Sequence, residues 1–88
     1  MDNIGQQCVM LFESIHNVMG AEQQLKNAGM WCDLIPTPRQ LSSECGMAVA
    51  IHYRDYQSAV RIIGWDTGLA GLFRIVGDDV EAIVFDRD

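Results

Sequence analysis

The sequence predicts one α+β domain in which a single sheet carries two helices on one face. Three observations predict this fold class. Short apolar runs of strand length alternate with two apolar stripes at helical spacing, and a glycine-aspartate turn separates the last two runs. The 88 residues leave room for one domain, and the 49% hydrophobic content is that of a globular chain.

The first half of the chain predicts a strand, a helix and a second strand. The run Cys8–Phe12 is continuously apolar, as expected for a buried central strand. A helix follows, with Ser14 as its N-cap and Gly29 as its stop. The apolar stripe of this helix consists of Val18, Ala21, Leu25 and Ala28. The run Trp31–Ile35 has the length and composition of the second strand.

The second half predicts a strand, a second helix and a hairpin. The predicted strands of this half are Gly46–His52, Leu72–Val76 and Val80–Phe85. Asp55 is placed to cap the helix, and Gly64 ends it. The stripe of this helix consists of Tyr56, Ala59, Val60 and Ile63. Residues 65–71 are rich in turn formers, and Gly77, Asp78 and Asp79 form the hairpin turn.

The order of the elements is β-α-β-β-α-β with one added C-terminal strand. Right-handed crossovers through both helices place them on the same face of the sheet, which is the ferredoxin-like arrangement. We expect the second strand to border the third, and the fourth to lie on the other side of the first. We also expect the first and third strands to be parallel neighbours.

Charge and composition exclude several classes of function. The net charge is −6 and the basic residues form no cluster, which disfavours nucleic-acid binding. We expect no signal peptide, because the apolar run Cys8–Phe12 is too short, and no membrane span, because no run approaches ~20 apolar residues. Three dispersed cysteines argue against a disulfide framework and favour a reducing cytoplasm. The absence of C-x-x-C and H-x-x-x-H spacings predicts no metal site and no cofactor.

The segment PTPRQLSSECG places a thiol, Cys45, where a loop enters the third predicted strand. Pro36 and Pro38 stiffen this loop and give it a defined shape at little entropic cost. An arginine lowers a thiol pKa, hydroxyls donate hydrogen bonds, and glycine leaves room for a ligand. The residues expected to support the thiolate in these ways are Arg39, Ser42, Ser43 and Gly46. The alternative is a small buried side chain, the usual fate of an unpaired cysteine.

The two histidines are expected to lie far from this thiol. His52 follows Cys45 by seven residues on the same predicted strand, roughly 23 Å away at ~3.3 Å per residue. His16 begins the first helix, at the far end of the first strand, so we expect both histidines at the opposite edge of the sheet from Cys45. A cysteine hydrolase needs a histidine beside the thiol, so we expect a protein that is not an enzyme in its own right.

Cys8 is a candidate resolving thiol. It begins the first strand, and Cys45 precedes the third, so a parallel pair of strands would bring both to one edge. Side-chain direction or register would keep them apart in the alternative case, because a disulfide needs Cα atoms within about 7 Å.

The sequence resembles the putative selenium/sulfur carrier protein-like family of small bacterial and archaeal proteins. The helix segment AEQQLKNAG and the pattern P-x-P-R-x-x-S-S-x-C-G carry the resemblance, which runs from about Val9 to Val76. Within the single domain, 1–88, the resemblance implies a family-like core, 8–76, and an added C-terminal strand and tail, 77–88. It also implies that Cys45 holds sulfur or selenium as a persulfide or selenopersulfide between donor and acceptor proteins.

The alternative is a non-catalytic interaction or regulatory module in which Cys45 is structural. Helices cover only one face of a ferredoxin-like sheet, and an apolar open face marks a dimer or partner site. The apolar residues expected on that face are either Cys8, Met10 and Phe12 or Val9 and Leu11, with Trp31 and Ile35 as further candidates. We therefore expect a homodimer through the open sheet face.

Overall fold

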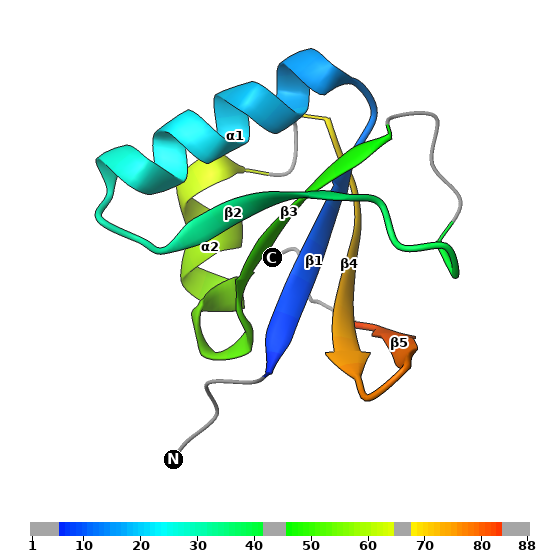
Figure 1. The fold of residues 1–88 in the computed structure, drawn as a ribbon. Coiled ribbons are helices and arrows are strands. Elements are labelled where there is room, and N and C mark those ends of the chain that lie inside the picture. The colour runs from blue at the N-terminus through cyan, green and yellow to red at the C-terminus, as the bar shows by residue number, and fades with distance from the viewer. Residues whose placement is uncertain (1–5, 42–45, 65–67, 84–88) are drawn as a thin grey trace.

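The computed structural model of the chain describes residues 6–41, 46–64 and 68–83. Within these ranges the elements are, in chain order, β1 Gln7–Phe12, α1 Ile15–Asn27, β2 Cys32–Pro36, β3 Met47–His52, a 3₁₀ turn η2 Tyr53–Asp55, α2 Tyr56–Ile63, β4 Leu69–Val76 and β5 Asp79–Ala82. Figure 1 shows both helices on the same side of one sheet. The predicted α+β class, with an extra C-terminal strand, is confirmed. None of the described helices is long and apolar enough to cross a membrane.

The strands are ordered β2-β3-β1-β4-β5, which confirms the predicted neighbours. All pairs are antiparallel, so the prediction that β1 and β3 are parallel is wrong. Cys8 pairs with Ile51 and Met10 with Val49, so β1 begins beside the end of β3. The crossover through α1 returns the chain parallel to β1 as β2, and the connection from β2 to β3 then reverses its direction.

Helix α1 has the predicted boundaries. The Ser14 hydroxyl accepts a hydrogen bond from the Asn17 backbone N–H at 3.3 Å, as an N-cap does. Gly29 follows the helix at φ 79°, a conformation that glycine adopts without strain. The buried residues of the helix are Val18, Ala21 and Leu25. Ala28 is exposed, so the stripe ends one turn earlier than the spacing predicts.

Helix α2 begins differently from its prediction. The 3₁₀ turn η2 precedes it, and Asp55 occupies the N-cap position without a side-chain capping bond. Its φ of −98° and ψ of 0° continue the turn, whereas a capping residue has extended backbone. Ala59, Val60 and Ile63 are buried as predicted.

The last two strands also differ in extent from the predicted ones. β4 begins at Leu69, within the segment expected to be turn, because Leu69 pairs with Phe12 of β1 across a register shift. Tertiary pairing with a central strand thus overrides the turn propensity of this segment. β5 pairs with β4 as the predicted hairpin, and Asp79 belongs to β5 rather than to the turn. The end of the predicted strand, at Phe85, lies outside the described residues.

The sheet separates two apolar clusters. The larger one lies between the sheet and the helices, and its strand residues include Cys8, Met10 and Phe12. The smaller one lies on the open face and contains Val9, Leu11 and Ala48. Alternation along β1 therefore turns Val9 and Leu11 away from the helices, which decides between the two sets that the sequence left open.

Candidate functional site

The thiol of the predicted site, Cys45, lies outside the described residues, as do Ser42 and Ser43. The structure describes the chain on both sides of them. On the N-terminal side it places residues 36–41, and on the C-terminal side it places Gly46 and the start of β3. The geometry of the site is therefore the geometry of these two flanks.

The two flanks of the loop are held together as a continuation of the sheet. Pro36 is the last residue of β2 and pairs with Met47, and the Thr37 backbone N–H donates to the Gly46 carbonyl at 3.0 Å. The predicted strand ends at Ile35, but pairing continues to Pro36 because β2 is an edge strand, where a missing N–H is tolerated. The flanks thus fix where the loop leaves and re-enters the sheet.

Beyond Thr37 the chain turns onto the open face. The Leu41 backbone N–H donates to the Pro38 carbonyl at 3.0 Å, which closes a tight turn. The Leu41 side chain packs against the cluster of Val9, Leu11 and Ala48. Arg39 lies in the turn and is exposed, which leaves its charge accessible to an anionic group. The N-terminal flank of the loop is thus a turn anchored by Leu41.

A second anchor joins this loop to the β4–β5 turn. The side-chain amide of Gln40 donates to the backbone carbonyl of Asp78. The two residues are 38 positions apart in the chain, so no local pattern predicts the contact. The C-terminal hairpin therefore touches the segment that leads to Cys45.

Cys8 is a core residue. Its side chain has no exposed surface, and burial raises the pKa of the Cys8 thiol to about 12, against a smaller lowering by a hydrogen bond with the Phe73 backbone. Cys8 lies beside Ile51, near the end of β3, whereas Cys45 precedes the start of β3. The parallel pairing that would bring both thiols to one edge is thus absent, and a resolving role for Cys8 stays an untested prediction.

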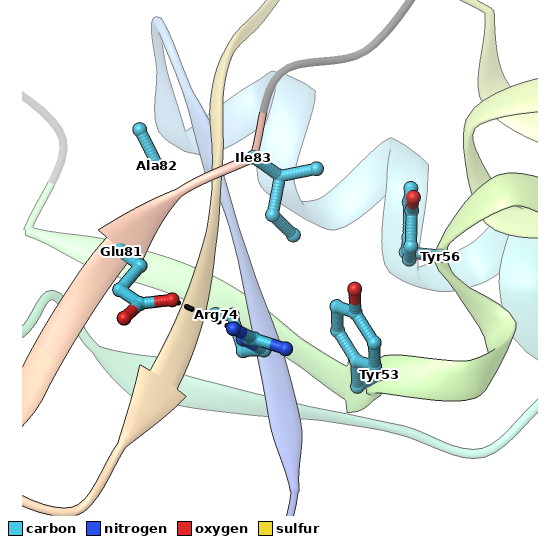
Figure 2. Close-up of a pocket in the computed structure, with 6 residues that line it drawn as sticks. All are labelled: Tyr53, Tyr56, Arg74, Glu81, Ala82 and Ile83. Carbon is cyan, nitrogen blue, oxygen red and sulfur yellow. Dashed lines mark hydrogen bonds and ion pairs between the residues drawn. The ribbon is translucent and has the colours of Figure 1, made fainter.

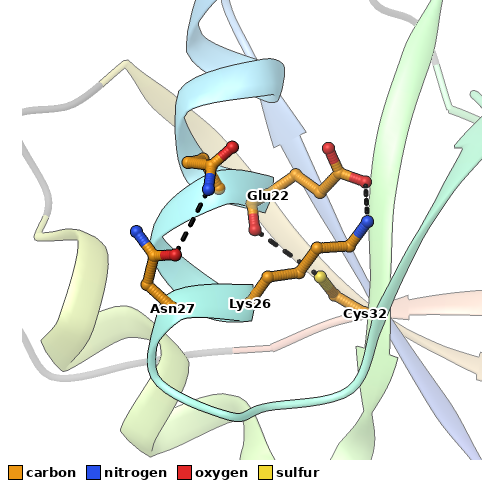
Figure 3. Close-up of polar contacts among 5 residues, drawn as sticks. Glu22, Lys26, Asn27 and Cys32 are labelled. Atoms are coloured by element: carbon orange, nitrogen blue, oxygen red, sulfur yellow. Dashed lines mark hydrogen bonds and ion pairs between the residues drawn. The ribbon is translucent and has the colours of Figure 1, made fainter.

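Cys32 lies on the helix side of β2, next to a charged pair of α1 (Figure 3). Its thiol donates to the Glu22 carbonyl at 3.8 Å, and Lys26 Nζ lies 3.0 Å from the Glu22 carboxylate. Partial burial, followed by the Glu22 charge, raises the pKa of the Cys32 thiol. The positive charge of Lys26 lowers this pKa, but by less than burial and Glu22 raise it. The arrangement favours a protonated, weakly nucleophilic thiol.

The two histidines lie at opposite ends of the sheet. His16, at the start of α1, follows β1 and so lies at the end of the sheet where β3 begins. The expectation that it lies at the other end is wrong, because β1 and β3 are antiparallel. His52 ends β3 and stacks on Trp31 with ring centroids 4.5 Å apart. Of the two histidines, only His52 lies at the predicted end of the sheet, away from the start of β3. The argument against a Cys–His dyad therefore rests on His52 alone.

Groups of three or more histidine, cysteine or carboxylate side chains that could hold a metal ion do not occur among the described residues. The sequence likewise contains no spacing typical of a metal site.

The fold and the loop define a small ferredoxin-like α+β domain with a cysteine-containing β2–β3 loop. The chain belongs to the Putative Se/S carrier protein-like family, whose model matches residues 7–65. The match confirms the resemblance seen in the sequence and spans β1 through α2, so β4 and β5 lie beyond it. No curated protein and no solved structure matches the chain.

Proposed function

We propose that the protein is a sulfur or selenium carrier and that Cys45 is its carrier thiol. Membership of the Se/S carrier-like family is the observation that carries the proposal. The surroundings of the other two thiols support the choice of residue. Cys8 is buried with a pKa raised to about 12, and the pKa of Cys32 is raised as well. Both environments suppress the thiolate, which is the reactive form.

The transfer is an exchange that needs no external oxidant. The Cys45 thiolate attacks the terminal sulfur of a donor persulfide, R–S–SH, and forms a new sulfur–sulfur bond. The bond between that sulfur and the donor breaks, and the donor leaves as R–S⁻ with the electron pair. The terminal sulfur keeps its proton. An acceptor thiolate repeats the exchange and returns Cys45 to its thiolate, and a selenopersulfide donor follows the same steps.

The loop supplies two kinds of support in this proposal. The exposed guanidinium of Arg39 provides a permanent positive charge for the thiolate, and Ser42, Ser43 and Gly46 provide hydroxyl and backbone donors. Pro36, Pro38 and the Leu41 anchor hold the flanks of the loop in one conformation. In this proposal the protein works in a reducing cytoplasm, where a donor protein loads Cys45 and an acceptor protein unloads it.

The test is the intact mass of the native protein after treatment with cysteine persulfide. Wild type and Cys32→Ser are expected to gain one sulfur atom that a reducing thiol removes, and Cys45→Ser is expected to gain none. Peptide mapping then locates the added sulfur. An adduct on Cys32, or an unmodified Cys45 in a folded protein, would contradict the proposal.

The second candidate is an interaction module in which Cys45 is structural. Trp31 favours it, because this residue is 44% exposed and follows the alternation of β2 onto the open face. The centre of that face is already buried within one chain, since Val9 and Ala48 have no exposed surface. The predicted homodimer stays untested and would be built around the Trp31 margin. Sedimentation equilibrium of wild type and Trp31→Ala distinguishes a dimer from a monomer.

A further inference from the structure

A second polar site lies on the helix side of the sheet, between the β4–β5 hairpin and the start of α2. It is a cavity of about 230 Å³ lined by Tyr53, Tyr56, Arg74, Glu81, Ala82 and Ile83. Arg74 pairs with Cys8 in the sheet and therefore points to the helix side, whereas Leu41 packs on the opposite face. The cavity is thus separate from the loop that leads to Cys45.

The cavity presents both signs of charge on one wall. Arg74 Nη2 lies 2.7 Å from Glu81 Oε1, and the side chains of the two residues are 33% and 54% exposed. Such a pair is accessible to solvent, and little free energy is lost when a ligand separates it. Figure 2 shows Arg74 between the Glu81 carboxylate and the Tyr53 ring.

The lining beside Arg74 is aromatic. The Tyr53 and Tyr56 rings lie with centroids 5.2 Å apart, and the Arg74 guanidinium carbon lies 5.0 Å from the Tyr53 ring centre. The cation–π contact orients the guanidinium plane beside the ring. The two tyrosine side chains and Ile83 line the cavity beside the charges.

These charges select the class of ligand. A simple anion would be attracted to Arg74 but repelled by Glu81. A simple cation would be attracted to Glu81 but repelled by Arg74. A zwitterion satisfies both charges. The Arg74 guanidinium can bind the ligand's carboxylate through two parallel hydrogen bonds, and the Glu81 carboxylate can accept hydrogen bonds from the ligand's ammonium group. The cavity is smaller than the pockets of about 300–1,000 Å³ that typically hold drug-sized ligands, so its size indicates a small metabolite.

We propose that this cavity binds a small zwitterion of the α-amino-acid type. Its carboxylate pairs with Arg74, its ammonium group pairs with Glu81, and its side chain lies against Tyr53 and Tyr56. This site is independent of the carrier function proposed for Cys45, so each can fail without the other.

The sequence makes the site easy to observe. The chain has two tyrosines, and both line the cavity, so NMR signals of selectively labelled tyrosine rings report on this site alone. The probes are L-methionine, its carboxylate-only analogue 4-(methylthio)butanoate and its amine-only analogue 3-(methylthio)propylamine. We expect saturable shifts with methionine, and a dissociation constant about tenfold lower than for either analogue, since each lacks one charge pair.

Two variants separate a charge effect from misfolding. Arg74→Gln and Glu81→Gln are each expected to weaken methionine binding about tenfold. Arg74→Gln leaves Glu81 unpaired and should strengthen binding of the amine analogue, whereas Glu81→Gln should strengthen binding of the carboxylate analogue. Loss of folding cannot produce this crossed pattern. Arg61→Gln, which removes an exposed charge of α2 outside the cavity, is the matched control and should bind like wild type.

Two results would overturn the proposal. One is the absence of saturable tyrosine shifts with methionine in the folded wild-type protein. The other is binding of all three probes with equal affinity, because the cavity would then recognise only the shared thioether chain.

Discussion

At the scale of single residues, the cysteines show how environment decides chemistry. Cys8 sits in a central strand without exposed surface, and Cys32 sits in an edge strand beside the Glu22–Lys26 pair. Both side chains pack as small apolar groups, and their raised pKa values disfavour the nucleophilic thiolate. The loop context in the sequence predicts Cys45 as the reactive thiol, and the full burial of Cys8 became visible only in the packing of β1 against the helices.

The raised pKa of Cys8, about 12, predicts that the free energy of unfolding falls at alkaline pH. Below about pH 9 the thiol is protonated in both states, so its contribution is complete. At higher pH the unfolded thiol loses its proton while the folded thiol keeps it, and the free energy of unfolding falls until the pH passes the folded pKa. We expect a loss of roughly 1.4 kcal/mol per pH unit in this window.

The measurement is urea unfolding of wild type and Cys8→Ala at several pH values between about pH 7 and about pH 11. The other titrating groups are common to both proteins, so their contributions cancel in the difference. The wild-type curve should fall more steeply than that of the variant only above about pH 9. Parallel curves would show that Cys8 titrates near its ordinary pKa in the folded protein.

At the scale of elements, the two helices begin in different ways although the sequence offers each a capping residue. Ser14 has extended backbone, with φ −151° and ψ 164°, and its hydroxyl accepts from Asn17 N. Asp55 follows a 3₁₀ turn, which gives it φ −98°, and its side chain makes no capping bond. The residue type predicts the position of the cap, but the backbone that enters it decides whether the bond forms.

This difference predicts unequal costs for removing the two caps. Ser14→Ala is expected to lower the free energy of unfolding by about 1 kcal/mol, because the Asn17 N–H loses its partner. Asp55→Ala should change it by less than about 0.5 kcal/mol. Urea unfolding of both variants beside wild type gives the comparison. Equal losses would mean that Asp55 stabilises α2 by a contact other than capping.

At the scale of the whole molecule, the chain covers much of its own open face. The turn after β2 places Leu41 on the cluster of Val9, Leu11 and Ala48, and Ile35, Phe73 and Ile75 pack around the same cluster. The Gln40 side chain joins this turn to the C-terminal hairpin. The segment that leads to Cys45 therefore contributes to the second core and is not a free appendage.

Removal of the leucine anchor should weaken this second core. We expect Leu41→Ala to lower the free energy of unfolding by about 1–2 kcal/mol, since a half-buried leucine loses apolar contacts. Amide exchange of Ala48 and Val9 should become faster in this variant. Met19→Ala, at a side chain that is 57% exposed, is the control and should stay within about 0.5 kcal/mol of wild type. Equal effects of both substitutions would remove Leu41 from the core.

The elements that depend on local pattern could be predicted from the amino-acid order alone. Helical spacing located α1 and α2, Ser14 and Gly29 marked the ends of α1, and the order of elements gave the neighbours in the sheet. These features are local or follow from the handedness of crossovers, which chain chirality fixes. The family also followed from a contiguous motif, because the P-x-P-R-x-x-S-S-x-C-G pattern lies in one segment.

Which distant groups meet became known only from the packed fold. Antiparallel pairing placed Cys8 beside Ile51 and His16 at the end of the sheet where β3 begins. Long-range contacts also placed Gln40 on Asp78 and Arg74 against Tyr53. The physical reason is that strand direction and side-chain contacts between distant segments minimise the free energy of the whole packed chain, which no single window of sequence encodes.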